Sequence, residues 1–148
     1  MSTPRIKVLF LCTGNSCRSQ MAEGLTTHDL GDRVQVCSAG LIPSHVHTKA
    51  IQVMKEIGID ISNHRSKHFK EFEGQSFDYV ITLCDEAREA CPVFPGATKQ
   101  HHFGFTDPVT AVGSEDQVLA VFRKVRDEIH KEVVSWLKER LSTKRCML

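Results

Sequence analysis

The stretch RIKVLFLCTGNSCRSQMAEGLTTHDL, residues 5–30, contains a strand, a loop and a helix in direct succession. Its first part, Arg5–Leu11, is apolar with little alternation, which is typical of a parallel strand buried on both faces. Its last part, residues 19–30, has its apolar side chains on one side of a helix, and Gly31 would end that helix. The loop Cys12–Ser19 therefore joins the carboxyl end of a strand to the N-terminus of a helix.

The rest of the chain continues to alternate between strands and helices. We predict further strands at Val34–Ser38, Phe77–Leu83 and Lys99–Phe103, helices at residues 46–57 and from residue 114 onward, and a short helix or loop at residues 85–90. Ser114 and Gln117 form a capping box at the start of the last helix. Strands that alternate with helices imply right-handed crossovers. We therefore expect one α/β domain, residues 1–148, with a four-stranded parallel sheet and helices on both faces.

The length and the net charge of the chain limit the classes of function that it can have. A chain of 148 residues can bury a core within a single domain. A formal net charge of +1 gives no general attraction to nucleic acid or to a membrane, so an anionic substrate would need a local positive site. We see no signal peptide and no apolar run long enough to span a membrane. We expect a cytoplasmic monomer that binds neither nucleic acid nor membranes.

The six cysteines indicate thiol chemistry. Without a secretory signal, they are expected to be reduced, catalytic or metal-bound rather than a disulfide framework. The pairs Cys12/Cys17 and Cys84/Cys91 are spaced more widely than the usual structural zinc pairs, which argues against zinc. Cys12, Cys84 and Asp107 each follow a predicted strand. Because ligands bind beyond the carboxyl ends of parallel strands, we expect these residues at one edge of the sheet.

The loop Cys12–Ser19, which we call the oxyanion loop, has the composition of an anion site with a nucleophile beneath it. Its backbone amides can turn inward around an oxyanion, and the helix that follows adds its positive N-terminal end. These donors come from Thr13, Gly14, Asn15, Ser16, Cys17 and Arg18. The Arg18 guanidinium can bind two oxygens of the same anion. The same donors favour the thiolate form of Cys12, and Asn15 and Ser19 can hold the loop and hydrogen-bond the sulfur.

Together with several other segments, the oxyanion loop resembles the sequences of a known family. The residues that carry the resemblance lie in Val8–Gly24, Ser38–Gly40, Gly58–His64, Thr82–Asp85, Cys91–Pro92, His102–Pro108 and Val125–Ile129. These segments are similar to those of the thioredoxin-coupled arsenate reductases, which share the fold of low-molecular-weight protein tyrosine phosphatases. The resemblance covers nearly the whole chain.

The resemblance implies a role for each of three cysteines in arsenic detoxification. Cys12 would attack arsenate, Cys84 would attack the Cys12 sulfur and release arsenite, and Cys91 would then attack Cys84. Thioredoxin would reduce the final disulfide, so no tightly bound cofactor is needed.

Asp107 matches the general acid of the phosphatase fold, although an Asp-Pro pair is also an ordinary turn. A regular helix would hold the Cα atoms of residues 84 and 91 about 10.5 Å apart, and a disulfide needs about 4.4–6.8 Å, so this segment must bend or unwind.

A potassium ion binds near the oxyanion loop in some members of the family. The matching ligands would be Asn15, Glu23 and Ser38, but Lys67 stands at the fourth position, which is usually acidic. A lysine cannot ligate a cation, and its ammonium group could take the place of the ion. His64 and His68 are spaced as two metal ligands on a helix, without an evident third ligand; His64 also matches a family position that supports the loop.

Two other functions remain open at this stage. A low-molecular-weight protein tyrosine phosphatase needs Cys12, Arg18 and Asp107 but neither Cys84 nor Cys91. Such phosphatases have two tyrosines after the Asp-Pro pair, where this chain has Val109 and Thr110. The third possibility is a non-catalytic module that binds oxyanions or senses thiol oxidation.

Overall fold

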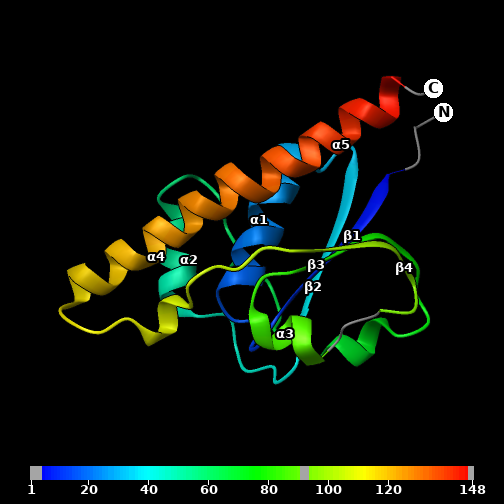
Figure 1. Ribbon diagram of the computed structural model, residues 1–148. Coiled ribbons are helices and arrows are strands. Elements are labelled where there is room, and N and C mark those ends of the chain that lie inside the picture. Colours follow the sequence, from blue (N-terminus) through cyan, green and yellow to red (C-terminus); the bar gives the residue numbers. More distant parts are fainter. Residues whose placement is uncertain (1–4, 91–93, 147–148) are drawn as a thin grey trace.

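The computed structural model describes residues 5–90 and 94–146, which form a parallel sheet and the helices packed against it (Figure 1). The strands are β1 (Ile6–Cys12), β2 (Val34–Gly40), β3 (Phe77–Thr82) and β4 (Ala97–His102). They lie in the order β2-β1-β3-β4, and every pairing is parallel. Because β1 lies between β2 and β3, its residues 8–11 are buried on both faces. The predicted strands are confirmed, with ends shifted by one or two residues.

Helices cover both faces of this sheet. The helices are α1 (Arg18–Leu30), α2 (Thr48–Lys55), α3 (Asp85–Ala90), α4 (Glu115–Ile129) and α5 (Ser135–Cys146); the shorter helical segments are η1 (Phe69–Phe72), η2 (Pro108–Thr110) and η3 (His130–Val134). On one side, α1 packs against α2, α4 and η3. On the other side, η1 contacts β2, and α3 contacts β1 and β3 (Figure 1). The predicted fold class is therefore confirmed.

Side-chain caps decide where two helices begin. Ser114 and Gln117 form the predicted capping box at the start of α4. The helix α2 begins two residues later than predicted, because the His47 side chain accepts a hydrogen bond from the Lys49 amide and so acts as the N-cap. This cap also brings the start of α2 next to the oxyanion loop, since the His47 amide donates to the Ser16 carbonyl over 3.1 Å.

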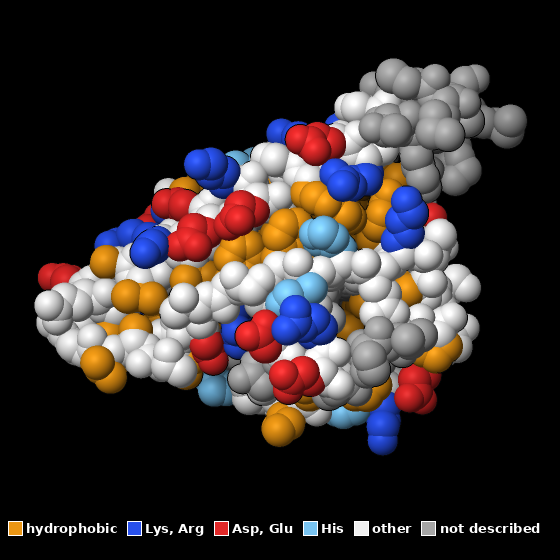
Figure 2. Space-filling model, viewed as in Figure 1, with side chains coloured by type: hydrophobic (Ala, Val, Ile, Leu, Met, Phe, Trp, Pro, Cys, Tyr) orange, Lys and Arg blue, Asp and Glu red, His pale blue; other side chains and the backbone are white. Residues whose placement is uncertain are grey.

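The segments α4, η3 and α5 form one continuous rod (Figure 1). The π-helical segment η3 adds a residue to one turn, so that Val133 and Val134 are both buried. The next turn directs Trp136 to β3 and β4, where its ring lies 5.2 Å from that of Tyr79 and 4.7 Å from that of His101. Hydrophobic side chains remain visible in a band beside this rod, whereas charges of both signs are mixed over its outer face (Figure 2).

The carboxyl end of β2 allows the oxyanion loop to lie directly against it. Gly40 is the register partner of Cys12. A β-carbon at Gly40 would lie 2.7 Å from the Thr13 carbonyl oxygen and 2.8 Å from the Asn15 amide nitrogen. Only glycine fits this close approach, so Gly40 fixes the position of the loop relative to the sheet.

Thr26 in α1 gives a prediction about stability. Its hydroxyl is buried and lacks a hydrogen-bond partner among the described residues. Valine has the same shape without the polar atom, so Thr26→Val should raise the free energy of unfolding by about 1 kcal/mol, as measured by denaturant unfolding. Thr27→Val is the matched control, because Thr27 is exposed on the same helix and the change there should be small. A loss of stability in Thr26→Val would refute this interpretation.

Among the described residues, no helix combines the length and the apolar character that crossing a membrane requires.

Candidate active site

The oxyanion loop turns its carbonyl groups outward. The carbonyl oxygens of Thr13, Gly14 and Ser16 accept hydrogen bonds of 2.9–3.2 Å from backbone amides within residues 41–47. In a trans peptide unit the C=O and N–H bonds point in opposite directions. The amides that follow these three carbonyls therefore turn toward the inside of the loop, and inward-facing amides of this kind can bind anions.

Asn15 holds the loop in shape. It is fully buried and has a positive φ of 48°, a conformation that asparagine tolerates better than most residues. Its Oδ1 accepts hydrogen bonds from the Lys67 amide at 2.8 Å and from Gln20 Nε2 at 3.0 Å. Its Nδ2 donates to Ser19 Oγ at 2.7 Å and to Ser38 Oγ at 3.0 Å. All of these bonds agree with a single orientation of the side-chain amide.

With this orientation, Asn15 is a donor to Ser19 and leaves the Ser19 proton available. Ser19 Oγ accepts a hydrogen bond from Asn15 and lies 2.9 Å from Cys12 Sγ. A serine hydroxyl has one proton and two lone pairs, so Ser19 can accept from Asn15 and donate its proton to the sulfur when Cys12 is a thiolate. A donated hydrogen bond stabilises a thiolate more than a thiol. The predicted roles of Asn15 and Ser19 thus correspond to an ordered chain of donors that ends on Cys12.

Arg18 is held at the mouth of the loop from two sides. Its side chain is only 7% exposed; Nη1 donates to the Phe105 carbonyl at 3.2 Å, and Nη2 lies 3.4 Å from Asp107 Oδ2. Asp107 caps η2 by accepting a hydrogen bond from the Val109 amide. The carboxylate therefore lies beside the guanidinium that would bind the anion, which is where a proton donor to a leaving oxygen is needed.

Cys84 lies next to the same loop. The Leu83 amide donates to the Leu11 carbonyl at 2.8 Å, so Cys12 and Cys84 are the next residues at the carboxyl ends of adjacent strands. Cys84 is buried, and its Sγ lies 3.3 Å from Thr13 Oγ1. The prediction that strand order would bring Cys12, Cys84 and Asp107 to one edge agrees with this placement. Cys91 lies outside the described residues.

A cavity of about 400 Å³ opens at this edge of the sheet. It is lined by Arg18, Cys84, Asp85, Gly104, Phe105, Thr106 and Asp107. Within this lining the Arg18 guanidinium suits an anion and Cys84 supplies a thiol, while the two carboxylates are paired with basic side chains, Asp107 with Arg18 and Asp85 with His102.

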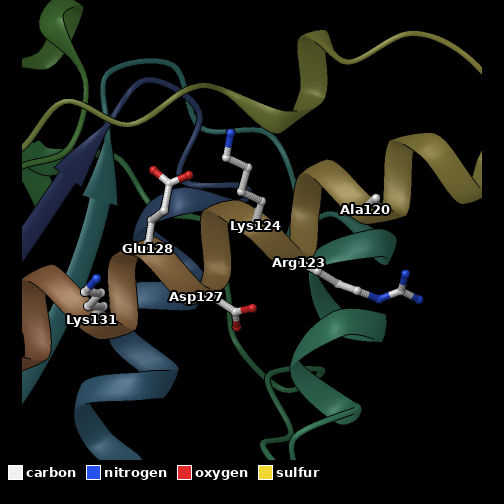
Figure 3. A pocket seen from close by; sticks show the side chains of 6 residues that line it. All are labelled: Ala120, Arg123, Lys124, Asp127, Glu128 and Lys131. Atoms are coloured by element: carbon white, nitrogen blue, oxygen red, sulfur yellow. The ribbon is translucent and has the colours of Figure 1, made fainter.

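A second hollow, on the outer side of α4, has no comparable chemistry. It is bordered by Ala120, Arg123, Lys124, Asp127, Glu128 and Lys131. Their side chains diverge from the helix and do not converge on a common point (Figure 3). The edge of the sheet is therefore the candidate active site.

Cys17 gives a prediction about thiol reactivity. Burial raises the pKa of the Cys17 thiol to about 12. At pH 8 the reactive thiolate is then only about 10⁻⁴ of the population. We expect iodoacetamide to leave Cys17 unmodified in the folded protein at pH 8 and to label it after denaturation, as read by peptide mass spectrometry. Rapid labelling of Cys17 in the folded protein would contradict this assignment.

The residues expected to hold potassium lie together, but their polar atoms are already paired. Ser38 Oγ donates to Glu23 Oε1 at 2.6 Å and accepts from Asn15. Lys67 Nζ donates to the Arg65 carbonyl at 2.7 Å; burial lowers the pKa of Lys67, and the nearby Glu23 acts in the opposite direction. No group of three or more His, Cys, Asp or Glu side chains that could hold a metal ion occurs in residues 5–90 and 94–146. This donor set does not fit a cation, and the chemistry derived below needs none.

His64 and His68 do not share a helix, because residues 61–67 form turns and extended backbone. The spacing argument for a metal pair therefore does not apply. His64 Nδ1 instead lies 3.0 Å from Gln20 Oε1 and 3.6 Å from Glu23 Oε2. Gln20 is fully buried and also donates to the backbone carbonyl of Asn15. His64 thus supports the oxyanion loop through Gln20. The sequence analysis had not identified Gln20 as part of this support.

Comparison with known proteins identifies the class. Residues 7–146 match the family described as low molecular weight phosphotyrosine protein phosphatase, and the chain belongs to this family.

Within this class, the chain is similar to several arsenate reductases. The arsenate reductase of Halalkalibacterium halodurans is 48% identical over 126 residues, which cover 85% of this chain and 91% of that protein. A solved arsenate reductase in the phosphate-binding state superposes with a TM-score of 0.78 at 36% identity, covering 90% of this chain and 98% of the other. A thioredoxin-dependent arsenate reductase of Corynebacterium glutamicum has a TM-score of 0.67 at 29% identity over 96% of this chain and 65% of its own. The family resemblance stated from the sequence motifs is confirmed.

Proposed function

We propose that this chain reduces arsenate to arsenite in the cytoplasm, through a relay of Cys12, Cys84 and Cys91 with thioredoxin as the electron donor. One observation carries the proposal. Cys12 begins the oxyanion loop, with its sulfur 2.9 Å from Ser19 Oγ, and the Cys84 thiol follows the adjacent strand, lies 3.3 Å from Thr13 Oγ1 and lines a cavity together with Arg18. The arsenate reductases among the similar proteins support the choice of substrate.

In the first step the anion binds between the loop amides and the Arg18 guanidinium. The Cys12 thiolate, which accepts the Ser19 hydrogen bond, attacks arsenic and forms an S–As bond. One As–O bond breaks, and its oxygen leaves as water. Asp107, beside Arg18, is placed to supply a proton to that oxygen.

In the second step the Cys84 sulfur attacks the Cys12 sulfur. The S–S bond forms as the S–As bond breaks, and its electron pair stays on arsenic, which changes from As(V) to As(III) and departs as arsenite. The two cysteines follow the adjacent ends of β1 and β3, which are joined by the hydrogen bond from the Leu83 amide to the Leu11 carbonyl, and this proximity favours the attack.

In the third step the Cys91 thiolate attacks the Cys84 sulfur and releases Cys12 as a thiolate. Thioredoxin then reduces the Cys84–Cys91 disulfide by dithiol exchange, supplying two electrons and two protons. Residues 85–90 form the helix α3 in this structure. A helix continued through residues 84–91 would hold the two cysteines too far apart for a disulfide, so we expect this segment to bend or unwind during this step.

That requirement gives a further prediction. Backbone amides at the C-terminal half of α3 should exchange with deuterium faster in the arsenate-oxidised protein than in the reduced protein, because the helical hydrogen bonds are lost. Peptide-resolved hydrogen exchange measures the difference, with α1 as an internal reference whose protection should stay constant. Equal protection of α3 in the two states would contradict the relay.

The phosphatase alternative is less well supported. Val109 is exposed beside Asp107, and the chain's single tyrosine, Tyr79, is buried in β3, so no tyrosine borders the cavity. A phosphatase also has no use for a buried thiol at residue 84. Weak hydrolysis of small aryl phosphates is still expected, because the oxyanion loop accepts phosphate by the same geometry.

The proposed function is tested by following NADPH consumption with arsenate, thioredoxin and thioredoxin reductase. We expect consumption that depends on arsenate and on thioredoxin, with an equimolar yield of arsenite. Hydrolysis of an aryl phosphate with no arsenate-dependent consumption would identify the protein as a phosphatase. Sedimentation in the same buffer tests the expectation of a monomer.

A further inference from the structure

His102, the last residue of β4, connects the two elements on either side of Cys84. Its Nδ1 lies 2.7 Å from Thr82 Oγ1 at the end of β3. Its Nε2 lies 2.9 Å from Asp85 Oδ1 at the start of α3. Only Leu83 and Cys84 separate these two partners in the chain. The imidazole therefore bridges the short segment that contains the Cys84 thiol.

The chemistry of the two partners determines which nitrogen of the neutral His102 ring carries the proton. A carboxylate can only accept, so Nε2 carries a proton and donates it to Asp85. In the neutral ring Nδ1 then accepts the Thr82 hydroxyl proton. Both ring nitrogens are thus paired, and the His102 side chain is 19% exposed. Gly104 lies close to this pair, since a β-carbon there would be 3.6 Å from His102 Nε2.

The helix α3 depends on such contacts. It has six residues, and an isolated helix of this length is not stable in water. Inside the helix, Arg88 lies 3.7 Å from Asp85 in an exposed pair, which contributes little. The buried Ala87 anchors one face. His102 ties the first residue of α3 to the sheet: its ring is 19% exposed, more sheltered than Arg88, although the Asp85 side chain itself is 69% exposed.

We propose that His102 is a positioning residue for the second step of the reaction. By holding Asp85 against β4, it fixes the start of α3 and keeps the Cys84 thiol beside Thr13 and the Cys12 loop. This inference rests on the relay proposed above. It adds a residue that touches neither the anion nor a reacting sulfur, and whose loss slows the attack of Cys84 on Cys12 while leaving the chemistry of Cys12 intact.

The experiment isolates that step in a Cys91→Ser background, where the reaction stops at the Cys12–Cys84 disulfide. The rate of disulfide formation after addition of arsenate is measured by quenched mass spectrometry. Aryl phosphate hydrolysis by the same proteins reports Cys12, Arg18 and Asp107 alone. Absence of the Cys12–Cys84 disulfide in the Cys91→Ser protein itself would overturn the relay and, with it, the role of His102.

Two replacements of His102 separate its two hydrogen bonds. The side-chain nitrogen of His102→Gln can replace Nε2 and donate to Asp85, whereas that of His102→Asn reaches only the position of Nδ1. We expect disulfide formation to slow roughly tenfold in His102→Asn and to stay near the parent rate in His102→Gln, because the lost bond has a charged acceptor. His101→Asn is the matched control, since the neighbouring ring stacks on Trp136 instead.

Three results would overturn the proposal. In the first, His102→Asn forms the disulfide at the parent rate. In the second, His102→Asn and His102→Gln are slowed equally, which would mean that the Asp85 bond is not what matters. In the third, aryl phosphate hydrolysis falls in parallel with disulfide formation, which would indicate a general structural role.

Discussion

Replacing Cys12 by serine will abolish both arsenate reduction and aryl phosphate hydrolysis. A serine hydroxyl is far less acidic and less nucleophilic than a thiol, so serine cannot replace the attacking sulfur. We expect both rates to fall by at least about 10⁴-fold, the scale seen when an enzyme loses its nucleophile. Initial rates of NADPH consumption and of aryl phosphate hydrolysis measure the two losses.

Cys37→Ser is the control for this substitution. Cys37 is a half-buried strand residue, away from the cavity lining. Its replacement should leave both rates unchanged. Residual turnover in Cys12→Ser above a few per cent of the parent rate would show that the oxyanion loop does not hold the nucleophile.

Replacing Cys84 by serine should separate the two reactions. A serine at this position can keep the hydrogen bond to Thr13 Oγ1, so the cavity should keep its shape. It cannot form a disulfide, so arsenite is not released from the Cys12 adduct. We expect arsenate turnover to fall by at least about 10³-fold, while aryl phosphate hydrolysis continues at the parent rate.

The two assays together make this prediction specific. Loss of both activities in Cys84→Ser would indicate that Cys84 is needed for the structure of the site. Arsenate turnover at the parent rate would reject Cys84 as the second thiol of the relay.

The sequence predicted the parts of the site that depend on local connectivity. Cys12 and Arg18 belong to one loop between a strand and a helix, so their relation follows from a few consecutive residues. Cys12, Cys84 and Asp107 could be assigned to one edge because strand order in a parallel sheet fixes which ends meet. These inferences needed only the alternation of apolar segments with the loop-forming residues between them.

Contacts made by distant backbone groups could not be predicted in this way. The Phe105 carbonyl holds Arg18, and the Lys67 amide holds Asn15, but a carbonyl or an amide is present at nearly every residue and carries no sequence signal. Gln20 was missed because α1 is buried on several sides, so no polar face shows which of its residues point to the loop. The π-helical segment η3 contains no glycine or proline from which an irregular turn could have been predicted.

In the proposed relay, sulfur atoms pass oxidising equivalents from Cys12 to the cysteines that follow β3. The most direct measurement is to add one equivalent of arsenate to the fully reduced protein without thioredoxin, and then to map disulfides by peptide mass spectrometry while assaying arsenite. We expect an equimolar yield of arsenite and a single disulfide between Cys84 and Cys91, with Cys12 again free. Arsenite formed with all cysteines still reduced, or no arsenite at all, would contradict this expectation.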